Sequence, residues 1–385
     1  MYNIKTLNKI SKIGLDAFSD KYTIADDCET PDAILVRSAK MHDYAFNPEL
    51  LCIARAGAGT NNIPSDRCAE EGIVVFNTPG ANANSVKELV ICAMLLASRD
   101  IVGGIEWVNS IAGTDDVAGQ VEKGKSAYVG PELYGKSLGV IGLGAIGARI
   151  ANDAIDLGMK VYGYDPYLSV EAAWRLSAGV KHATDLDTIY KNCDYITIHI
   201  PYMESTKHTI NAEALSKMKD GVRIINLARA ELVDDDAMIE AINTGKVARY
   251  VTDFPNNKTA GIKGIVAIPH LGASTPESED NCAVMAANEI MEYLENGNIT
   301  NSVNMPRATL PVTGDPRVCI IHKNIPEMIA KITTKVSANG TNIENLVNAG
   351  RGGIAYTMLD VQSVPDGLAN AIMTIEGVIR VRIIK

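Results

Sequence analysis

The stretch Val140–Gly147, which reads VIGLGAIG, follows an apolar run and precedes a segment with helical periodicity. Its glycines Gly142, Gly144 and Gly147 have the G-x-G-x-x-G spacing of a dinucleotide-binding turn. In such a turn the first glycine allows a tight bend, the second lets a pyrophosphate approach the backbone, and the third lets helix and strand pack closely. The phosphates lie at the positive end of the helix. The stretch therefore predicts a nucleotide-binding α/β domain.

An acidic residue, Asp165, ends the next apolar run, KVYGYD. A carboxylate at this point accepts hydrogen bonds from the adenosine ribose hydroxyls and repels a 2′-phosphate, so it favours NAD over NADP. Taken alone, the glycine pattern has a second interpretation, a turn that serves only backbone geometry. The strand before it and the acid after it make NAD binding the favoured interpretation.

The chain from 137 to 269 repeats an apolar strand followed by a helix or a loop. The predicted strands read SLGVIGLG, KVYGYD, YITIHIP, VRIINLA, ARYVTDF and IVAIP. Because these runs are continuously apolar, they predict a parallel sheet covered on both faces. We therefore expect a doubly wound, Rossmann-type NAD domain over residues 106–276.

The first part of the chain shows the same alternation in AILVRS, LLCIARAG and GIVVFNTPG, which predicts a second doubly wound parallel sheet. A long helical stretch over residues 84–108 comes next, and a second one, over residues 276–296, comes after the predicted NAD domain. We predict a substrate-binding domain composed of residues 1–105 with 277–305.

The last part of the chain, from residue 306 onward, shows a different order of predicted elements. Prolines and little apolar periodicity predict a linker over residues 306–314. Residues 315–385 then follow the order βαββαβ, which is typical of the ferredoxin-like arrangement. A unit of this size suits regulation or assembly better than catalysis.

Composition narrows the classes of partner. Lys and Arg total 36 against 46 acidic residues, for a net charge of −10, which argues against nucleic-acid binding. No apolar run reaches the length of a membrane span, so we expect a cytoplasmic protein without membrane contact. Seven cysteines without C-x-x-C spacing predict neither disulfides nor a metal site.

The segments VIGLGAIG, GYDP, NLARAELVDDDAM and PHLGAST, in this order and spacing, resemble the D-2-hydroxyacid dehydrogenase family, and the terminal unit resembles an ACT domain. The resemblance covers nearly the whole chain. It implies NAD-dependent oxidation of a D-2-hydroxy acid. With the ACT-like unit, it implies the oxidation of 3-phospho-D-glycerate to 3-phosphohydroxypyruvate, the first step of phosphorylated L-serine biosynthesis.

Two catalytic residues follow from this resemblance. Arg229 matches the family's catalytic arginine, whose planar fork holds a substrate carboxylate and polarises the 2-oxo oxygen. His270 matches the acid/base histidine, which takes the hydroxyl proton as hydride leaves. Without the resemblance, both would be read as structural or surface residues.

The resemblance also implies the residues that contact the cofactor. Asp253 aligns with the family aspartate that contacts the nicotinamide carboxamide. Backbone or side-chain contacts are implied for Thr78, Ala145, Ile146, Ile200, Leu227, Ala228, Gly272 and Ala273, beside the three glycines and Asp165.

The chain departs from the family where a glutamate partner of the histidine is expected. The corresponding position falls near Asn257 or Lys258, and that loop holds no carboxylate. We therefore expect His270 to work without this partner. An amide at the position would stabilise imidazolium less than a carboxylate does.

Substrate recognition is expected in the first domain. Arg37, Lys40 and Arg55 are candidates to hold a phosphate dianion, and Ala58 and Gly59 could offer backbone N–H groups to the carboxylate. A solvated charge or a salt bridge is the alternative for each of the three cations.

The terminal unit carries His322, Asn324 and Asn342, which match the positions that bind serine in related ACT domains. L-serine is therefore a possible effector, although Glu327 stands where ACT domains often have glycine. Assembly alone is the alternative role. The long helices and the extra domain predict a homodimer or a homotetramer.

Two other functions stay open. The first is a related dehydrogenase acting on glycerate, hydroxypyruvate or another 2-hydroxy acid. The second is a non-catalytic, NADH-sensing binding protein, which the missing glutamate favours. The presence of both Arg229 and His270 counts against this second alternative.

Overall fold

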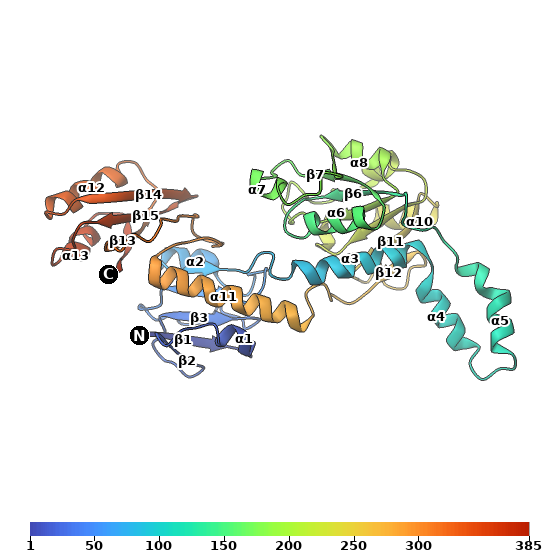
Figure 1. Ribbon diagram of the computed structural model, residues 1–385, viewed down its shortest axis with the longest axis horizontal. Coiled ribbons are helices and arrows are strands. Elements are labelled where there is room, and N and C mark those ends of the chain that lie inside the picture. The colour runs from blue at the N-terminus through green and yellow to red at the C-terminus, as the bar shows by residue number, and fades with distance from the viewer. Residues whose placement is uncertain (385) are drawn as a thin grey trace. The chain divides into compact units, whose positions relative to one another are not determined.

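The computed structural model describes residues 1–384, which form two compact units (Figure 1). The first unit joins residues 1–82 to the chain from Pro276 to its end, and the second spans residues 83–275. Helix α3 (Ala83–Ser98) belongs to the second unit, because it packs on the sheet of that unit.

The second unit is built on a seven-stranded parallel sheet with the order β12-β11-β10-β9-β6-β7-β8. The strands are β6 (Ser137–Ile141), β7 (Lys160–Tyr164), β8 (Lys181–His182), β9 (Tyr195–Ile198), β10 (Val222–Asn226), β11 (Val247–Thr252) and β12 (Ile265–Ala267). The central strands are almost fully buried, as their continuously apolar sequences predict.

Helices cover both faces of this sheet. One face packs on α3 and α6 (Gly147–Asp156), and the other on α8 (Leu186–Asn192), α9 (Ala212–Lys217) and α10 (Asp235–Asn243). The predicted doubly wound Rossmann-type arrangement is confirmed. Shorter elements of this unit are α5 (Val117–Gly124), η1 (Lys125–Tyr128), α7 (Val170–Ala173) and η2 (Ala230–Leu232).

The prediction of one long helix over residues 84–108 is wrong. The helix α3 ends at Ser98, and a separate helix, α4 (Ile101–Ser110), begins after Asp100. The Asp100 side chain accepts a hydrogen bond from the Gly103 backbone N–H at 3.2 Å. An aspartate at this position is a favoured N-cap, so it starts a new helix rather than continuing the old one.

The first unit contains a five-stranded parallel sheet with the order β2-β1-β3-β4-β5. Its strands are β1 (Tyr2–Leu7), β2 (Tyr22–Ala25), β3 (Ala33–Val36), β4 (Cys52–Arg55) and β5 (Val74–Phe76). The short helices α1 (Lys12–Leu15) and α2 (Ser65–Glu70) accompany it, and the long helix α11 (Pro276–Asn296) packs against it through Ala286, Ile290 and Tyr293.

The C-terminal part of the first unit follows the predicted βαββαβ order. Its elements are β13 (Arg317–Lys323), α12 (Met328–Ala338), β14 (Ile343–Arg351), β15 (Ile354–Val361), α13 (Leu368–Met373) and β16 (Val378–Ile384). The strands form an antiparallel sheet with the order β14-β15-β13-β16. The helices α12 and α13 cover one face, and residues of the other face share a core with the five-stranded sheet.

A buried arginine joins this C-terminal sheet to α11 and to the predicted linker. Arg317 pairs with the fully buried Asp360 at 2.6 Å. It also donates to the carbonyl oxygens of Asn296 at 2.8 Å and Pro311 at 2.7 Å. The linker is therefore held in place by defined hydrogen bonds.

Removal of this arginine should destabilise the first unit. The substitution Arg317→Ala leaves the Asp360 carboxylate buried and unpaired, so we expect a loss of about 3–5 kcal/mol in the free energy of unfolding. Lys331→Ala removes an exposed ion pair with Glu327 and should cost about 0–1 kcal/mol. Urea denaturation of both variants measures the difference, and equal losses would contradict the role given to Arg317.

Within residues 1–384, no helix combines the length and the apolar character that a membrane span requires.

Candidate active site

The glycine-rich turn connects β6 to α6, and its three glycines have different surroundings. Gly142 has φ +90°, and a Cβ there would lie 2.6 Å from the carbonyl oxygen of His199. A Cβ on Gly147 would lie 1.9 Å from the carbonyl oxygen of Gly142. Nothing lies within 4 Å of a Cβ placed on Gly144, so the backbone is open there. This geometry fits a turn that a pyrophosphate approaches closely.

Asp165 lies directly after β7 and is held by the same turn. Its Oδ2 accepts the Leu143 backbone N–H at 2.9 Å, and its Oδ1 accepts the Tyr167 backbone N–H at 2.9 Å. A carboxylate oxygen has two lone pairs, so each oxygen can accept one more hydrogen bond. The side chain is thus fixed and still able to receive ribose hydroxyls.

Asp253 follows β11 and is only 1% exposed, so the site contains a buried carboxyl group. Neither carboxylate oxygen has a hydrogen-bond partner among residues 1–384. Burial raises the pKa of Asp253, while the charge of His270, the nearby backbone N–H of Gly272 and the charge of Arg229 act in the opposite direction. The Gly272 N–H does not form a hydrogen bond of normal geometry with either oxygen. Buried acceptors are nearly always paired, so this carboxylate lacks a donor that a ligand would supply. The two N–H groups of a nicotinamide carboxamide have the right chemistry.

His270 follows β12 and is exposed. Its ring lies against that of Phe254, with a centroid separation of 4.6 Å and an angle of 46° between the ring planes. Among residues 1–384, no group is hydrogen-bonded to its ring nitrogens, so the imidazole is available to a substrate. Phe254 is the neighbour that limits the orientation of the ring.

The loop around Asn257, where the family has its glutamate, is hydrogen-bonded to the start of α10. The Nδ2 of Asn256 donates to Asp235 at 2.7 Å, and the Nζ of Lys258 donates to Asp236 at 2.7 Å. Both acids lie at the start of α10. Asn257 makes no side-chain hydrogen bond within the described residues. The hydrogen-bonding side chains of this loop thus contact α10.

Arg229 follows β10 and is exposed. The buried Asn226 fixes its backbone, because its Nδ2 donates to the Arg229 carbonyl at 2.8 Å and its Oδ1 accepts the Ala228 N–H at 3.2 Å. One guanidinium nitrogen of Arg229 donates to the Ala228 carbonyl at 2.6 Å. The other donors of the fork face no acceptor within residues 1–384, which suits a residue that binds a carboxylate.

The sheet topology brings most of the predicted site together. The glycine turn with Ala145 and Ile146, then Asp165, Ile200, Leu227, Ala228, Arg229, Asp253, His270, Gly272 and Ala273 all lie beyond the carboxyl ends of strands in the seven-stranded sheet. In open α/β sheets, ligands bind outside this edge. These residues therefore form one candidate site in the second unit.

The remaining candidates lie in the first unit. Thr78 is fully buried, and its Oγ1 has no partner among residues 1–384, so it too could receive a ligand. Arg37 forms an ion pair with Glu279, which makes it a weaker phosphate candidate than the sequence indicates. Arg55 Nε donates to the Arg37 carbonyl at 3.1 Å. Lys40 is exposed and forms no ion pair within the described part of the chain.

Ala58 and Gly59, whose backbone N–H groups are candidates to bind the substrate carboxylate, lie shortly after the end of β4. The Ala58 carbonyl accepts the Asn77 Nδ2 at 2.6 Å, and a Cβ on Gly59 would meet no atom closer than 3.9 Å. The N–H groups of Ala58 and Gly59 thus lie in a short, ordered turn.

The three effector candidates are bonded within the C-terminal domain. His322 is buried, with Nδ1 hydrogen-bonded to the Lys323 carbonyl at 2.8 Å and Nε2 to Thr357 Oγ1 at 2.9 Å. Asn324 donates to the Gly352 carbonyl at 3.1 Å, and Asn342 donates to Glu344 at 2.9 Å. Glu327 has φ +67°, the left-handed conformation that favours the glycine common in ACT domains.

Three residues of the site were not identified from the sequence. Phe254 and Asn226 act through contacts that only the fold brings about, although both lie beside predicted site residues. His199 is partly exposed and lies beside the glycine turn, where desolvation lowers its pKa to about 3 and Nε2 is hydrogen-bonded to Thr197 Oγ1 at 2.8 Å. A histidine held neutral in this way is structural.

Comparison with known proteins places this geometry in a family. Residues 91–272 match the model described as "D-isomer specific 2-hydroxyacid dehydrogenase, NAD binding domain". A D-3-phosphoglycerate dehydrogenase of Methanocaldococcus jannaschii is 31% identical over 379 residues, which cover 96% of this chain and 70% of that protein. A hydroxypyruvate reductase of Thermotoga maritima is 38% identical over 275 residues, which cover 68% of this chain and 85% of that protein.

Other relatives are longer than the region they share with this chain. The match to a D-3-phosphoglycerate dehydrogenase of Bacillus subtilis, 34% identical, covers 80% of this chain but only 60% of that protein. Among solved structures, an NAD⁺-bound 3-phosphoglycerate dehydrogenase of Entamoeba histolytica aligns with a TM-score of 0.59 at 25% identity. That alignment covers 79% of this chain and 98% of the Entamoeba chain.

The contact between Phe254 and His270 generates a prediction. Phe254→Leu removes the ring that limits the imidazole's orientation, so kcat should fall by about tenfold, equivalent to roughly 1.4 kcal/mol in the barrier. Phe254→Tyr keeps the ring and should retain most of the activity. Steady-state kinetics measures both, and NAD affinity should stay unchanged in each. A Leu variant as fast as the wild type would contradict the positioning role.

Proposed function

Because the chain belongs to the D-isomer specific 2-hydroxyacid dehydrogenase family and uses NAD, we propose that it oxidises 3-phospho-D-glycerate to 3-phosphohydroxypyruvate. The observation that carries this proposal is the grouping of Arg229, Asp253 and His270 at one edge of the NAD-binding sheet. The phosphorylated substrate is supported by the relatives named D-3-phosphoglycerate dehydrogenase.

Each residue has a distinct task in the proposed reaction. Arg229 holds the substrate carboxylate with its free guanidinium donors, which also places the C2 oxygen for reaction. His270 accepts the proton of the C2 hydroxyl through a ring nitrogen. Bound NAD⁺ supplies the acceptor for the hydride that leaves C2. The products are the 2-oxo acid, the reduced cofactor and the proton on His270.

The cofactor would be held along the carboxyl edge of the sheet. The glycine turn accommodates the pyrophosphate, Asp165 receives the ribose hydroxyls, and Asp253 accepts the carboxamide N–H groups. This assignment gives the Asp253 carboxylate the donors that it lacks within the protein. It also makes cofactor binding less favourable when Asp253 is protonated.

For the substrate phosphate we propose Arg55, supported by Lys40. Arg37 has Glu279 as a partner, so its charge is already compensated within the first unit. The backbone N–H groups of Ala58 and Gly59 are proposed to bind the carboxylate. A second candidate function, the reduction of hydroxypyruvate, is favoured by the Thermotoga maritima relative.

We also propose that the C-terminal βαββαβ domain is an ACT-type domain that binds L-serine or assembles the protein as a homodimer or homotetramer. The order of its elements and its antiparallel sheet support this proposal. Since both nitrogens of His322 are already hydrogen-bonded, serine binding would require a rearrangement there, and assembly is the better supported role. Light scattering that reports a monomer would contradict assembly.

One assay tests the substrate assignment. The purified protein with NAD⁺ should oxidise 3-phospho-D-glycerate with a kcat/KM at least about tenfold above that for D-glycerate, because the phosphate adds a charge-assisted contact. Arg55→Ala should raise KM for the phosphorylated substrate and leave KM for D-glycerate nearly unchanged, whereas Arg37→Ala should affect both little. L-serine added to the same assay reports whether it lowers the rate.

The outcomes separate the alternatives. Equal losses on both substrates in Arg55→Ala would contradict its phosphate role without affecting the dehydrogenase assignment. Faster turnover of hydroxypyruvate with NADH than of any phosphorylated substrate would favour the second candidate function. Absence of any turnover, with NAD still bound, would favour a binding protein over an enzyme.

A further inference from the structure

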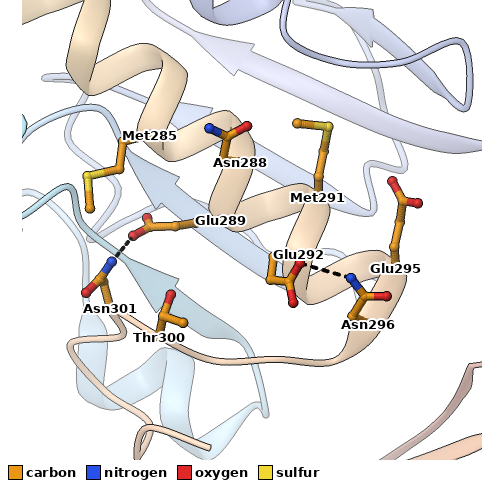
Figure 2. A pocket seen from close by; sticks show the side chains of 9 residues that line it. All are labelled: Met285, Asn288, Glu289, Met291, Glu292, Glu295, Asn296, Thr300 and Asn301. Atoms are coloured by element: carbon orange, nitrogen blue, oxygen red, sulfur yellow. Dashed lines mark hydrogen bonds between the residues drawn. The ribbon is translucent and has the colours of Figure 1, made fainter. Parts of the chain in front are cut away.

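A pocket of about 490 Å³ opens beside the C-terminal half of α11 in the first unit (Figure 2). Residues of α11 and of the segment that follows it line the pocket: Met285, Asn288, Glu289, Met291, Glu292, Glu295, Asn296, Thr300 and Asn301. Its volume is in the range of small-molecule sites. None of these residues belongs to the candidate active site, so the pocket calls for a separate explanation.

Glu289 is the unusual residue of this pocket. Its side chain is directed toward Asn301, and the residue is only 6% exposed (Figure 2). One carboxylate oxygen accepts a hydrogen bond from Asn301 Nδ2 at 2.6 Å, whereas Oε2 has no partner among residues 1–384. A buried carboxylate without a second partner is costly to the fold, which indicates that a ligand donor completes it.

The ionisable residues that line the pocket around Glu289 indicate which charge a ligand there would carry. Glu292 lies one turn further along α11, and its oxygens accept from Asn296 at 2.9 Å and Asn298 at 2.6 Å. Glu295 lies another turn on and accepts from Tyr22 at 2.6 Å and Lys21 at 2.5 Å. The lining thus has three carboxyl groups and no lysine, arginine or histidine, and Glu295 alone of the three pairs with a cation. The local field attracts cations and repels anions.

The kind of cation follows from the remaining residues. Within residues 1–384, no group of three or more His, Cys, Asp or Glu side chains is arranged to hold a metal ion. The side chains of Met285 and Met291 add flexible, apolar surface that suits methylene groups. A zwitterionic amino acid would bring its own carboxylate close to those of the pocket. An amine without a carboxylate fits both the charge and the apolar walls.

We propose that this pocket binds a small aliphatic amine in its ammonium form. The ammonium group donates to Oε2 of Glu289, and the aliphatic chain lies along Met285 and Met291. The site is independent of the proposed dehydrogenase activity, because it uses none of the residues assigned to NAD or the substrate.

Ionisation of Glu289 accompanies this binding. Burial raises the pKa of Glu289 to about 8, while the hydrogen bond from Asn301 acts in the opposite direction. The carboxyl group is therefore mostly neutral at pH 7 in the free protein and must release its proton to pair with an ammonium group. Amine affinity should rise with pH as Glu289 ionises.

Calorimetric titration of the full-length protein with 1,4-diaminobutane tests the proposal. We expect saturable binding at pH 8.5 and at least about tenfold weaker binding at pH 6.5, because the ionised fraction of Glu289 falls. The neutral analogue 1,4-butanediol has the same chain without charge and should not bind. L-ornithine, which adds a carboxylate, should bind more weakly than the diamine.

Two variants provide the matched comparison. Glu289→Gln keeps the shape of the side chain and should weaken diamine binding at least about tenfold, since one charge-assisted contact is lost. Glu295→Gln removes the same charge from the same helix, but from a carboxylate that Lys21 and Tyr22 already engage, so binding should change less than about threefold. A separate variant, Asn288→Lys, places an ammonium at the pocket and should compete with the diamine.

Three results would overturn the proposal. The first is no saturable heat with wild-type protein at pH 8.5, and the second is equal affinity for the diamine and the diol. The third is an unchanged affinity in Glu289→Gln. If that variant does not fold, an unchanged affinity in Asn288→Lys has the same meaning. NAD binding by each variant, measured alongside, reports whether the second unit is intact.

Discussion

A buried carboxylate without a hydrogen-bond partner, that of Asp253, is the constraint around which the candidate active site is arranged. Leaving such an acceptor unpaired costs about 1–3 kcal/mol. The fold tolerates this cost at the carboxyl edge of the seven-stranded sheet, between the strand ends that carry Arg229 and His270. Polar groups that the fold leaves unpaired mark where a ligand is needed, and here the nicotinamide carboxamide has the matching donors.

The same reasoning applies to Glu289, with a different outcome. Both Asp253 and Glu289 are buried acids with raised pKa values, and burial is the main cause in each. Asp253 has the opposing charges of His270 and Arg229 nearby, so an anionic substrate and a neutral carboxamide suit its surroundings. The pocket around Glu289 has two further carboxyl groups and no basic side chain in its lining, so its surroundings favour a cation. The neighbouring charges therefore distinguish the two sites.

Much of the fold and most of the NAD site could be predicted because their signals are local. The spacing of Gly142, Gly144 and Gly147 and the position of Asp165 follow from what a strand-turn-helix connection requires. The break at Asp100 is not predicted because an apolar period continues across it, although the aspartate is a recognisable N-cap. The Phe254–His270 contact, the Arg37–Glu279 pair and the hydrogen bonds of His322 depend on packing between distant segments, which periodicity does not encode.

We propose that His270 acts as the acid/base without a carboxylate partner. The most direct test is the pH dependence of kcat/KM for wild-type protein and for Asn257→Glu. If the introduced carboxylate reaches the imidazole, it should stabilise imidazolium and move the acidic limb of the profile to higher pH. An unchanged profile in Asn257→Glu, with activity retained, would contradict this account of the site.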